Sequence, residues 1–334
     1  MTRTAEIAHF LGQAGWSGAS AGPLAGDASA RSYLRLHLGG TSAVLMDAPP
    51  GSGEDIAPFL TIARYLKGEG YSAPDIIAAD PATGLILMED LGDDLYARLS
   101  ARAPAVEPEL YDAAVALLVD LHQRTPPAGL PPYSAEVYER EARLLTDWYL
   151  PAATGHTLPG DDYAALVNAA CARITPDRPC MVLRDYHAEN LLWLPDRKGI
   201  ARVGLLDFQD ALAGHPAYDL VSLLEDARRD TSADLRETML RRYVDATGSD
   251  PQAFRLAYAT LGAQRNLKII GIFARLWLRD GKPAYLDLMP RVWAHLQNDL
   301  AHPQLAALRD FIAAHVPEPT PLTLGKIRAA RHDA

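Results

Sequence analysis

The chain of 334 residues is predicted to have an α+β fold with a β-rich N-terminal lobe and a mainly helical C-terminal lobe. Residues 32–38 alternate apolar and polar side chains with a period of two, as in a half-buried strand, and the rest of residues 1–91 reads as further short strands and turns around a helix. From residue 92 onward, apolar residues recur at the three- and four-residue spacing of helices. At about 100–200 residues per domain, this length accommodates two lobes. We therefore expect lobes at 1–91 and 92–334, with a hinge at about 87–92.

The N-terminal lobe is expected to contain a short amphipathic helix, two hairpins and a second helix. Gly39-Gly40 separates two alternating segments, as in a tight β-hairpin. Apolar residues on one side of 54–68 predict a helix, and 80–84 reads as the turn of a second hairpin. The expected elements in chain order are a helix within 1–16, a turn at 23–27, strands 32–38 and 41–46, helix 54–68, and strands 76–79 and 85–88.

The C-terminal lobe is expected to be helical except for one small β insertion. Three short apolar segments joined by polar loops interrupt the helical pattern between 181 and 208. The expected helices are 109–122, 135–149, 163–174 and several from 218 to the end, and the expected strands are 181–183, 191–194 and 202–206.

Composition argues against several classes of protein. The 32 Lys and Arg against 42 Asp and Glu give a formal net charge of −10, which disfavours non-specific binding to nucleic acid. No segment approaches about 18 uninterrupted apolar residues, so we expect no membrane span. The only cysteines, Cys171 and Cys180, cannot supply a four-ligand zinc site and fit free thiols in the cytoplasm. Nothing in the sequence indicates an obligate protein partner.

Two acidic residues and an asparagine follow the short strands of the insertion. Asp185 precedes Asn190 by five residues, and Asp207 follows the last apolar segment. Phosphoryl transfer uses one carboxylate to orient the attacking hydroxyl, and an amide and a second carboxylate to hold Mg²⁺. Each aspartate alone also fits a turn former at a strand end. Together they favour catalysis, and the absence of HExxH argues against a metallohydrolase.

Residues 183–190 and 205–210 resemble the catalytic and metal segments of aminoglycoside-phosphotransferase-like small-molecule kinases, which are relatives of protein kinases. Residues 26–33, 44–50 and 264–276 look like those of the bacterial anomeric kinases that phosphorylate N-acetylmuramate and N-acetylglucosamine in cell-wall recycling. The resemblance implies a protein-kinase-like two-lobed fold, with ATP and Mg²⁺ as cofactors and a small sugar as substrate. It gives Asp185 the role of orienting the hydroxyl.

The resemblance also implies a nucleotide site. The turn before the first hairpin would contact the phosphates, and the hinge main chain would bind adenine; the residues are Ser29, Ala30, Arg31, Met88, Glu89 and Leu91. Kinase-like enzymes usually place a phosphate-binding lysine on the third strand, but no lysine precedes Lys67. Arg31 or Arg35 could replace it, Mg²⁺ could act alone, or the protein could be a pseudokinase. The complete Asp–Asn–Asp set argues against a pseudokinase, and the similar sugar kinases share the Met-Asp-Ala-Pro-Pro segment.

The acceptor site is less defined. Arg265, Lys268, Arg275 and Arg279 fall on one face of a predicted helix, either as a solvated basic face or as a site for an anion. Gln209 and Asp210 follow Asp207 and could bind sugar hydroxyls or an acetamido group. A basic site would fit the carboxylate of N-acetylmuramate or the phosphates of ATP. The alternative acceptors are an aminoglycoside, choline or another amino alcohol, and the basic residues argue against these cationic substrates. We expect His187 to order the catalytic loop and Asp219 to cap a helix or brace that loop.

Overall fold

The computed structural model describes residues 2–24, 31–51, 53, 55–158 and 160–331. The chain divides into two compact units. The first unit combines 1–117 with 188–211, and the second combines 118–187 with 212–334. The expected hinge at about 87–92 lies inside the first unit, and the assignment of lobes at that point stays a prediction.

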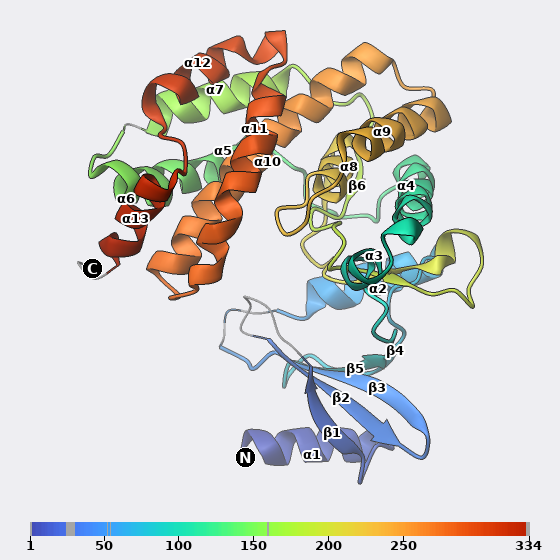
Figure 1. The fold of residues 1–334 in the computed structure, drawn as a ribbon. Helices are drawn as coiled ribbons and strands as arrows, with labels where there is room; N and C mark the ends of the chain where they lie inside the picture. The colour runs from blue at the N-terminus through green and yellow to red at the C-terminus, as the bar shows by residue number, and fades with distance from the viewer. Residues whose placement is uncertain (1, 25–30, 52, 54, 159, 332–334) are drawn as a thin grey trace. The chain divides into compact units, whose positions relative to one another are not determined.

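The first unit contains an antiparallel five-stranded sheet in the order β1-β2-β3-β5-β4 (Figure 1). Its strands are β1 Ser20–Leu24, β2 Ser32–Leu38, β3 Thr41–Asp47, β4 Ile76–Asp80 and β5 Leu85–Glu89. Both expected hairpins are present, and Tyr33 pairs with Met46 in the first. We expected a turn at 23–27, but Pro23 lies in β1. The proline is tolerated because β1 is an edge strand.

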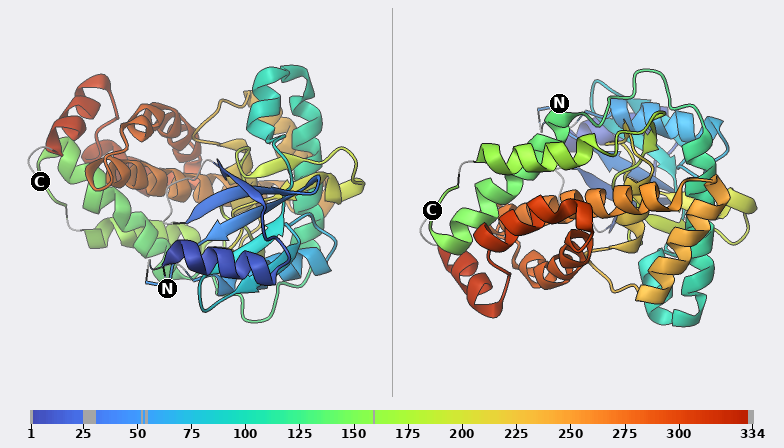
Figure 2. Two further views of the ribbon diagram at one scale, coloured as in Figure 1. Left: turned by 90° about the horizontal axis from the view of Figure 1, so that it is seen from below. Right: turned by 90° about the horizontal axis from the view of Figure 1, so that it is seen from above.

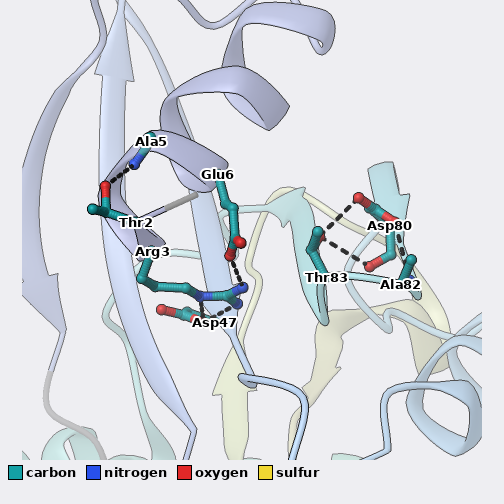
Figure 3. Close-up of polar contacts among 8 residues, drawn as sticks. All are labelled: Thr2, Arg3, Ala5, Glu6, Asp47, Asp80, Ala82 and Thr83. Carbon is teal, nitrogen blue, oxygen red and sulfur yellow. Dashed lines mark hydrogen bonds and ion pairs between the residues drawn. The ribbon is translucent and has the colours of Figure 1, made fainter.

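Helix α1 (Arg3–Gln13) packs its apolar side against this sheet. Phe10 lies in a cluster with Leu36, Leu45 and Leu87, which face the helix from three strands. The start of α1 is fixed by polar contacts, because Arg3 pairs with Asp47 at the end of β3 (Figure 3). The expected N-terminal helix is therefore confirmed, and it anchors the strand that carries the Met-Asp-Ala-Pro-Pro segment.

Beyond the sheet and α1, the first unit contains further helices and a small hairpin. These are α2 Ala57–Gly68, α3 Tyr96–Arg102, β7 Leu191–Trp193 and β8 Val203–Leu205. Phe59 of α2 stacks on Phe208 with ring centroids 5.0 Å apart. Ser72 forms a β-bridge with Gly204, so segments far apart in sequence join in one unit. Helix α4 (Glu107–Gln123) continues from the first unit into the second.

The second unit is built around the long helix α10 (Pro251–Leu278). It packs against α11 (Met289–Leu300), α5 (Ala135–Leu144) and the π-helical turn η2 (Leu145–Tyr149). A Cβ at Gly271 would lie 2.3 Å from the carbonyl carbon of Leu144, so only glycine lets α10 pass this backbone so closely. Figure 2 shows the green α5–α7 region beside the orange and red C-terminal helices.

The second unit also contains further helices and a pair of short strands. They are α6 Leu150–Thr154, α7 Gly160–Ala172, β6 Cys180–Val182, β9 Leu212–Gly214, α8 Ala217–Leu224, α9 Ala233–Thr247, α12 Ala306–His315 and α13 Pro321–Ala330. We expected one helix over 135–149, but it divides into α5 and η2. Strand β9 was not expected, and it pairs antiparallel with β6. In the described part of the chain, no helix has the length and apolar character needed to cross a membrane.

Candidate active site

The loop that carries Asp185 begins after β6 and is braced by Asp219 from the first turn of α8. The carboxylate of Asp219 is fully buried and accepts hydrogen bonds from the main-chain nitrogens of Leu183 (2.7 Å) and Arg184 (2.8 Å). Buried main-chain N–H groups need such partners, because leaving one unpaired costs about 1–3 kcal/mol. Asp219 therefore fixes the start of the loop, which is the bracing role that we expected.

Arg184 adopts a left-handed backbone conformation with φ of 70°. Only a few per cent of non-glycine residues do so, and such positions persist where surrounding contacts hold them. Here the main-chain nitrogen is bound to Asp219, and Nη2 donates to Glu141 Oε1 at 2.5 Å. The side chain and the backbone of Arg184 are thus both anchored, which sets the direction in which Asp185 leaves the strand.

Asp185 is half-buried among positive charges of the second unit. Burial raises the pKa of the carboxyl, but Lys268, His187, Arg265 and Arg184 together outweigh burial and lower it below its usual range. Asp185 is therefore ionised at neutral pH, so its carboxylate can accept a hydrogen bond from an attacking hydroxyl.

His187 orders the loop and is not a base at neutral pH. It is 5% exposed, and burial lowers the pKa of its imidazole to about 4. Nε2 lies 3.5 Å from Nη1 of Arg228, and the main-chain nitrogen donates to the Asp185 carbonyl at 3.1 Å. These contacts match the expected structural role.

Asn190 and Asp207 meet in the first unit because the hairpin of β7 and β8 brings them together. Leu191 pairs with Leu205, so the residue before β7 and the residues just after β8 lie at the same end. Nδ2 of Asn190 donates to Asp207 Oδ2 at 3.3 Å, and Asp207 has φ of 56°. The structure thus joins the two predicted metal ligands.

Gln209 and Asp210, the predicted sugar contacts, follow directly. Gln209 is 9% exposed, and its Nε2 donates to Asp207 Oδ1 at 2.7 Å. Asp210 is exposed. Gln209 therefore fixes the orientation of the Asp207 carboxylate, which the sequence did not predict.

The residues predicted to bind the nucleotide differ in whether their side-chain and main-chain groups are already paired. Ser29 and Ala30 lie outside the described residues, and Arg31 directly precedes β2. Met88 is buried in β5. The Glu89 side chain is paired with Arg197 at 2.5 Å, and its main-chain nitrogen donates to Asp75.

Leu91 follows β5, and within the described part of the chain its main-chain N–H and C=O have no hydrogen-bond partner. Leu91 is therefore the one of the expected adenine-binding residues Met88, Glu89 and Leu91 whose main-chain groups are unpaired in the described part of the chain.

Arg35, one of the two arginines considered as a substitute for the missing lysine, is already engaged in the first unit. Its Nε lies 2.8 Å from Asp90 Oδ2, and its Nη1 lies 2.8 Å from Asp93 Oδ2. Nη2 also donates to the carbonyl of Gly92. Arg35 thus ties β2 to the segment after β5.

The basic residues of α10 do not form a continuous solvated face, so that alternative is wrong. Arg265 is 5% exposed, and its Nη2 donates to Ser222 Oγ at 2.9 Å. Lys268 is largely buried and lies 2.9 Å from Glu141. Arg275 is partly buried, and burial lowers its pKa. Arg279 follows the end of the helix and pairs with Asp280.

Glu141, a carboxylate in α5 that is 4% exposed, was not predicted from the sequence as a site residue. It binds Arg184 and Lys268, the two cations nearest to the catalytic loop in this network. Glu141 lies on the buried side of its helix with Ala142 and Leu145. A carboxylate among the apolar residues on the buried side of a helix needs a partner, and this position was the one sign in the sequence that Glu141 pairs with a cation.

The model of the phosphotransferase enzyme family matches residues 20–257. The chain is 40% identical to an N-acetylmuramate/N-acetylglucosamine kinase of Caulobacter vibrioides, over 95% of this chain and 98% of that one. It is 37% identical to a protein of the same name from Pseudomonas aeruginosa, over 87% of each.

A solved structure of an aminoglycoside phosphotransferase bound to ADP is similar with a TM-score of 0.60. It is 14% identical, and the match covers 89% of this chain and 97% of that one. This likeness confirms the predicted α+β protein-kinase-like fold. Together with the match over most of the sequence, the fold shows that the chain belongs to the phosphotransferase enzyme family.

Proposed function

We propose that this enzyme transfers the γ-phosphoryl group of ATP to the anomeric (C1) hydroxyl of N-acetylmuramate, N-acetylglucosamine or both. The observation that carries the proposal is the Asp185, Asn190 and Asp207 set in a chain 32–40% identical to kinases named for these sugars. The reaction would serve peptidoglycan recycling, in the cytoplasm where ATP is available. In this enzyme, residues 1–91 would form the nucleotide-binding lobe, and residues 92–334 would carry the catalytic and acceptor residues.

Asp185 would accept the hydrogen bond of the C1 hydroxyl and hold that oxygen in line with the phosphoryl group. Its lowered pKa supports this role, because an ionised carboxylate is needed at neutral pH. An anomeric hydroxyl is more acidic than an ordinary alcohol, so a weak base is sufficient. Positioning by the braced loop would contribute most of the effect.

Asn190 and Asp207 would hold Mg²⁺. An amide oxygen and a carboxylate are ligands that suit this cation, and the 3.3 Å contact shows that the two side chains reach one point. The Asn190 amide would turn to present its oxygen. The described residues contain no group of three or more His, Cys, Asp or Glu side chains able to hold a metal, so phosphates and water would complete the shell. Bound Mg²⁺ neutralises the charge of the nucleotide phosphates.

The nucleotide would be bound by the hinge and by the turn before β2. The free main-chain groups of Leu91, with Met88 and Glu89 beside it, support adenine binding. Ser29, Ala30 and Arg31 would contact the phosphates, with Arg31 in place of the missing lysine. The ADP in the similar aminoglycoside phosphotransferase supports an adenine nucleotide as cosubstrate.

The acceptor would be held by Gln209 and Asp210, with Arg265, Lys268 and Arg275 supplying a positive field. Two of these cations lower the pKa of Asp185, so their charge reaches the reacting group. Such a field favours an acidic sugar and disfavours a polycationic aminoglycoside. Since Lys268 is paired with Glu141, it would act through its charge rather than by direct contact.

The test is a phosphorylation screen of free sugars, aminoglycosides and choline, with ³¹P NMR to locate the new phosphate. We expect transfer to C1 of one or both N-acetylated sugars. Asp185→Asn should abolish turnover and leave the Kd for ATP within about threefold, whereas Asp245→Asn, on the exposed side of α9, should match wild type. Transfer to choline alone, or ATP binding without any transfer, would contradict the proposal.

A further inference from the structure

We propose that Arg197, in the loop between β7 and β8, is a positioning residue for the nucleotide base. It fixes residues 89–95, called here the adenine segment, so that the main-chain groups of Leu91 select an adenine nucleotide over a guanine nucleotide. The inference rests on the proposed function, because it takes Leu91 as the adenine contact. Arg197 is not among the residues expected to bind nucleotide, metal or sugar, so it adds a residue to the site.

The guanidinium of Arg197 joins the end of β5 to the segment that precedes β4. Its Nη2 lies 2.5 Å from Glu89 Oε1, and its Nη1 donates to Ser72 Oγ at 2.7 Å. Ser72 is buried, and its hydroxyl donates in turn to the carbonyl of Ala201 at 2.6 Å. A planar, forked guanidinium suits such a double contact. Arg197 therefore ties Glu89 to the β7–β8 hairpin through two fixed partners.

Glu89, the first residue of the adenine segment, is held by its main chain as well as by this ion pair. Its main-chain nitrogen donates to the Asp75 carbonyl at 2.8 Å, and its Oε2 accepts from the Asp75 main-chain nitrogen at 3.2 Å. Both carboxylate oxygens thus have a donor. Without Arg197, Oε1 would lose its charged donor, and the partly exposed Glu89 side chain would be drawn toward water.

The other end of the adenine segment is held by the same hairpin. The main-chain nitrogen of Trp193 in β7 donates to the Asp94 carbonyl at 2.8 Å, and Leu95 forms a β-bridge with Leu192. Between the two ends, the side chain of Arg35 pairs with two carboxylates of the segment. The segment is therefore stretched between fixed points, and Arg197 supplies the side-chain contact at its start.

Leu91 lies between these fixed points, and its main-chain N–H and C=O are unpaired in the described part of the chain. A carbonyl at a fixed position can accept from the N6 amino group of adenine, whereas guanine presents the O6 acceptor in its place. A site with fixed polar groups rejects such an analogue, because the mismatched groups stay unpaired. Once the segment is released, the peptide group can turn to meet guanine. Restraint by Arg197 is therefore expected to show as base selectivity.

The hairpin that carries Arg197 also carries the predicted metal ligands at its opposite end. Asn190 directly precedes β7, and Asp207 follows β8 by two residues. These two residues are brought together by the ladder of β7 and β8, which does not involve the Arg197 side chain. Loss of Arg197 should therefore weaken binding of the base and leave the step at the metal unchanged.

The test compares the Kd of ADP and of GDP for the full-length enzyme by isothermal titration calorimetry, in wild type, Arg197→Met and Arg197→Lys. We expect wild type to prefer ADP, and Arg197→Met to bind ADP about tenfold more weakly and GDP within about threefold of wild type. KM for ATP should rise by the same factor, with kcat within about threefold. Arg197→Lys should retain part of the selectivity, because its ammonium keeps the charge but lacks the fork that reaches two partners.

The matched control is Lys198→Met, which removes the same charge from the next residue of the loop. Lys198 is exposed, so this variant should match wild type. A general loss of stability would lower both affinities together and leave their ratio unchanged. An unchanged ratio in Arg197→Met, an equal change in Lys198→Met, or a wild type without preference for ADP would overturn the inference. If wild type binds neither nucleotide and transfers no phosphoryl group, the proposed function fails; if wild type prefers ADP and Arg197→Met keeps that preference, only this inference fails.

Discussion

Replacement of Asp219 by alanine isolates the contribution of one buried carboxylate to the order of the catalytic loop. Asp219 is fully buried in α8, and its two oxygens each accept one main-chain N–H, from Leu183 at 2.7 Å and from Arg184 at 2.8 Å. Alanine would leave both N–H groups without an acceptor. Asparagine keeps one acceptor oxygen, so the pair of substitutions forms a graded series.

The expected magnitude follows from the number of orphaned groups. An unpaired buried N–H costs about 1–3 kcal/mol, so Asp219→Ala should destabilise the loop by about 2–6 kcal/mol and Asp219→Asn by about half as much. Because about 1.4 kcal/mol corresponds to a factor of ten, a cost of about 2–6 kcal/mol should lower the amide protection of the alanine variant at these two positions by about 30-fold to 2 × 10⁴-fold.

Hydrogen exchange read by NMR or by mass spectrometry of peptides covering 183–187 measures this loss directly. The matched control is Asp245→Ala on the exposed side of α9, which should change protection of the loop by less than about 0.5 kcal/mol. Unchanged protection in Asp219→Ala would refute the reasoning. Equal losses in the alanine and asparagine variants would refute the count of hydrogen bonds.

Two further predictions concern stability. A Cβ at Gly84 would lie 1.9 Å from the Ala48 carbonyl oxygen at a φ of 71°, so Gly84→Ala should cost about 2–4 kcal/mol in chemical denaturation. Gly70→Ala also has a positive φ but open space and should cost only about 1–2 kcal/mol; equal costs would refute the clash. Burial lowers the pKa of His187 to about 4, so the folded protein binds this proton only at a lower pH than the unfolded chain does. The free energy of unfolding should therefore decrease as the pH is lowered from about 6.5 to about 4. His187→Gln should reduce that slope, and an unchanged slope would contradict the assignment.

Local patterns in the sequence predicted the elements whose periodicity is strong. The alternation over 32–38 and 41–46 corresponds to β2 and to all but the last residue of β3. The proximity of Asn190 and Asp207 was also predictable, because the two residues flank two short strands that a hairpin brings into register. In both cases the information lies within a short stretch of chain.

Features that depend on contacts between distant residues were not predictable. The Glu141 network joins residues 133, 141, 184, 264 and 268, and no spacing rule connects them. Strand β1 was missed because Pro23 reads as a turn former, and only its edge position in the sheet makes it acceptable. Strand β9 has three residues, too few to show any period.

The interleaving of the two units constrains the order in which the chain can fold during synthesis. The first unit needs residues 188–211, whose Gly204 bridges to Ser72 and whose Ala188 carbonyl accepts from Ala97. A ribosome must therefore translate beyond Ala211 before that unit can close, although its five-stranded sheet has already emerged. Until then the five-stranded sheet has to persist without the β7–β8 hairpin. During that time the packing of α1 on the sheet is what buries its apolar residues.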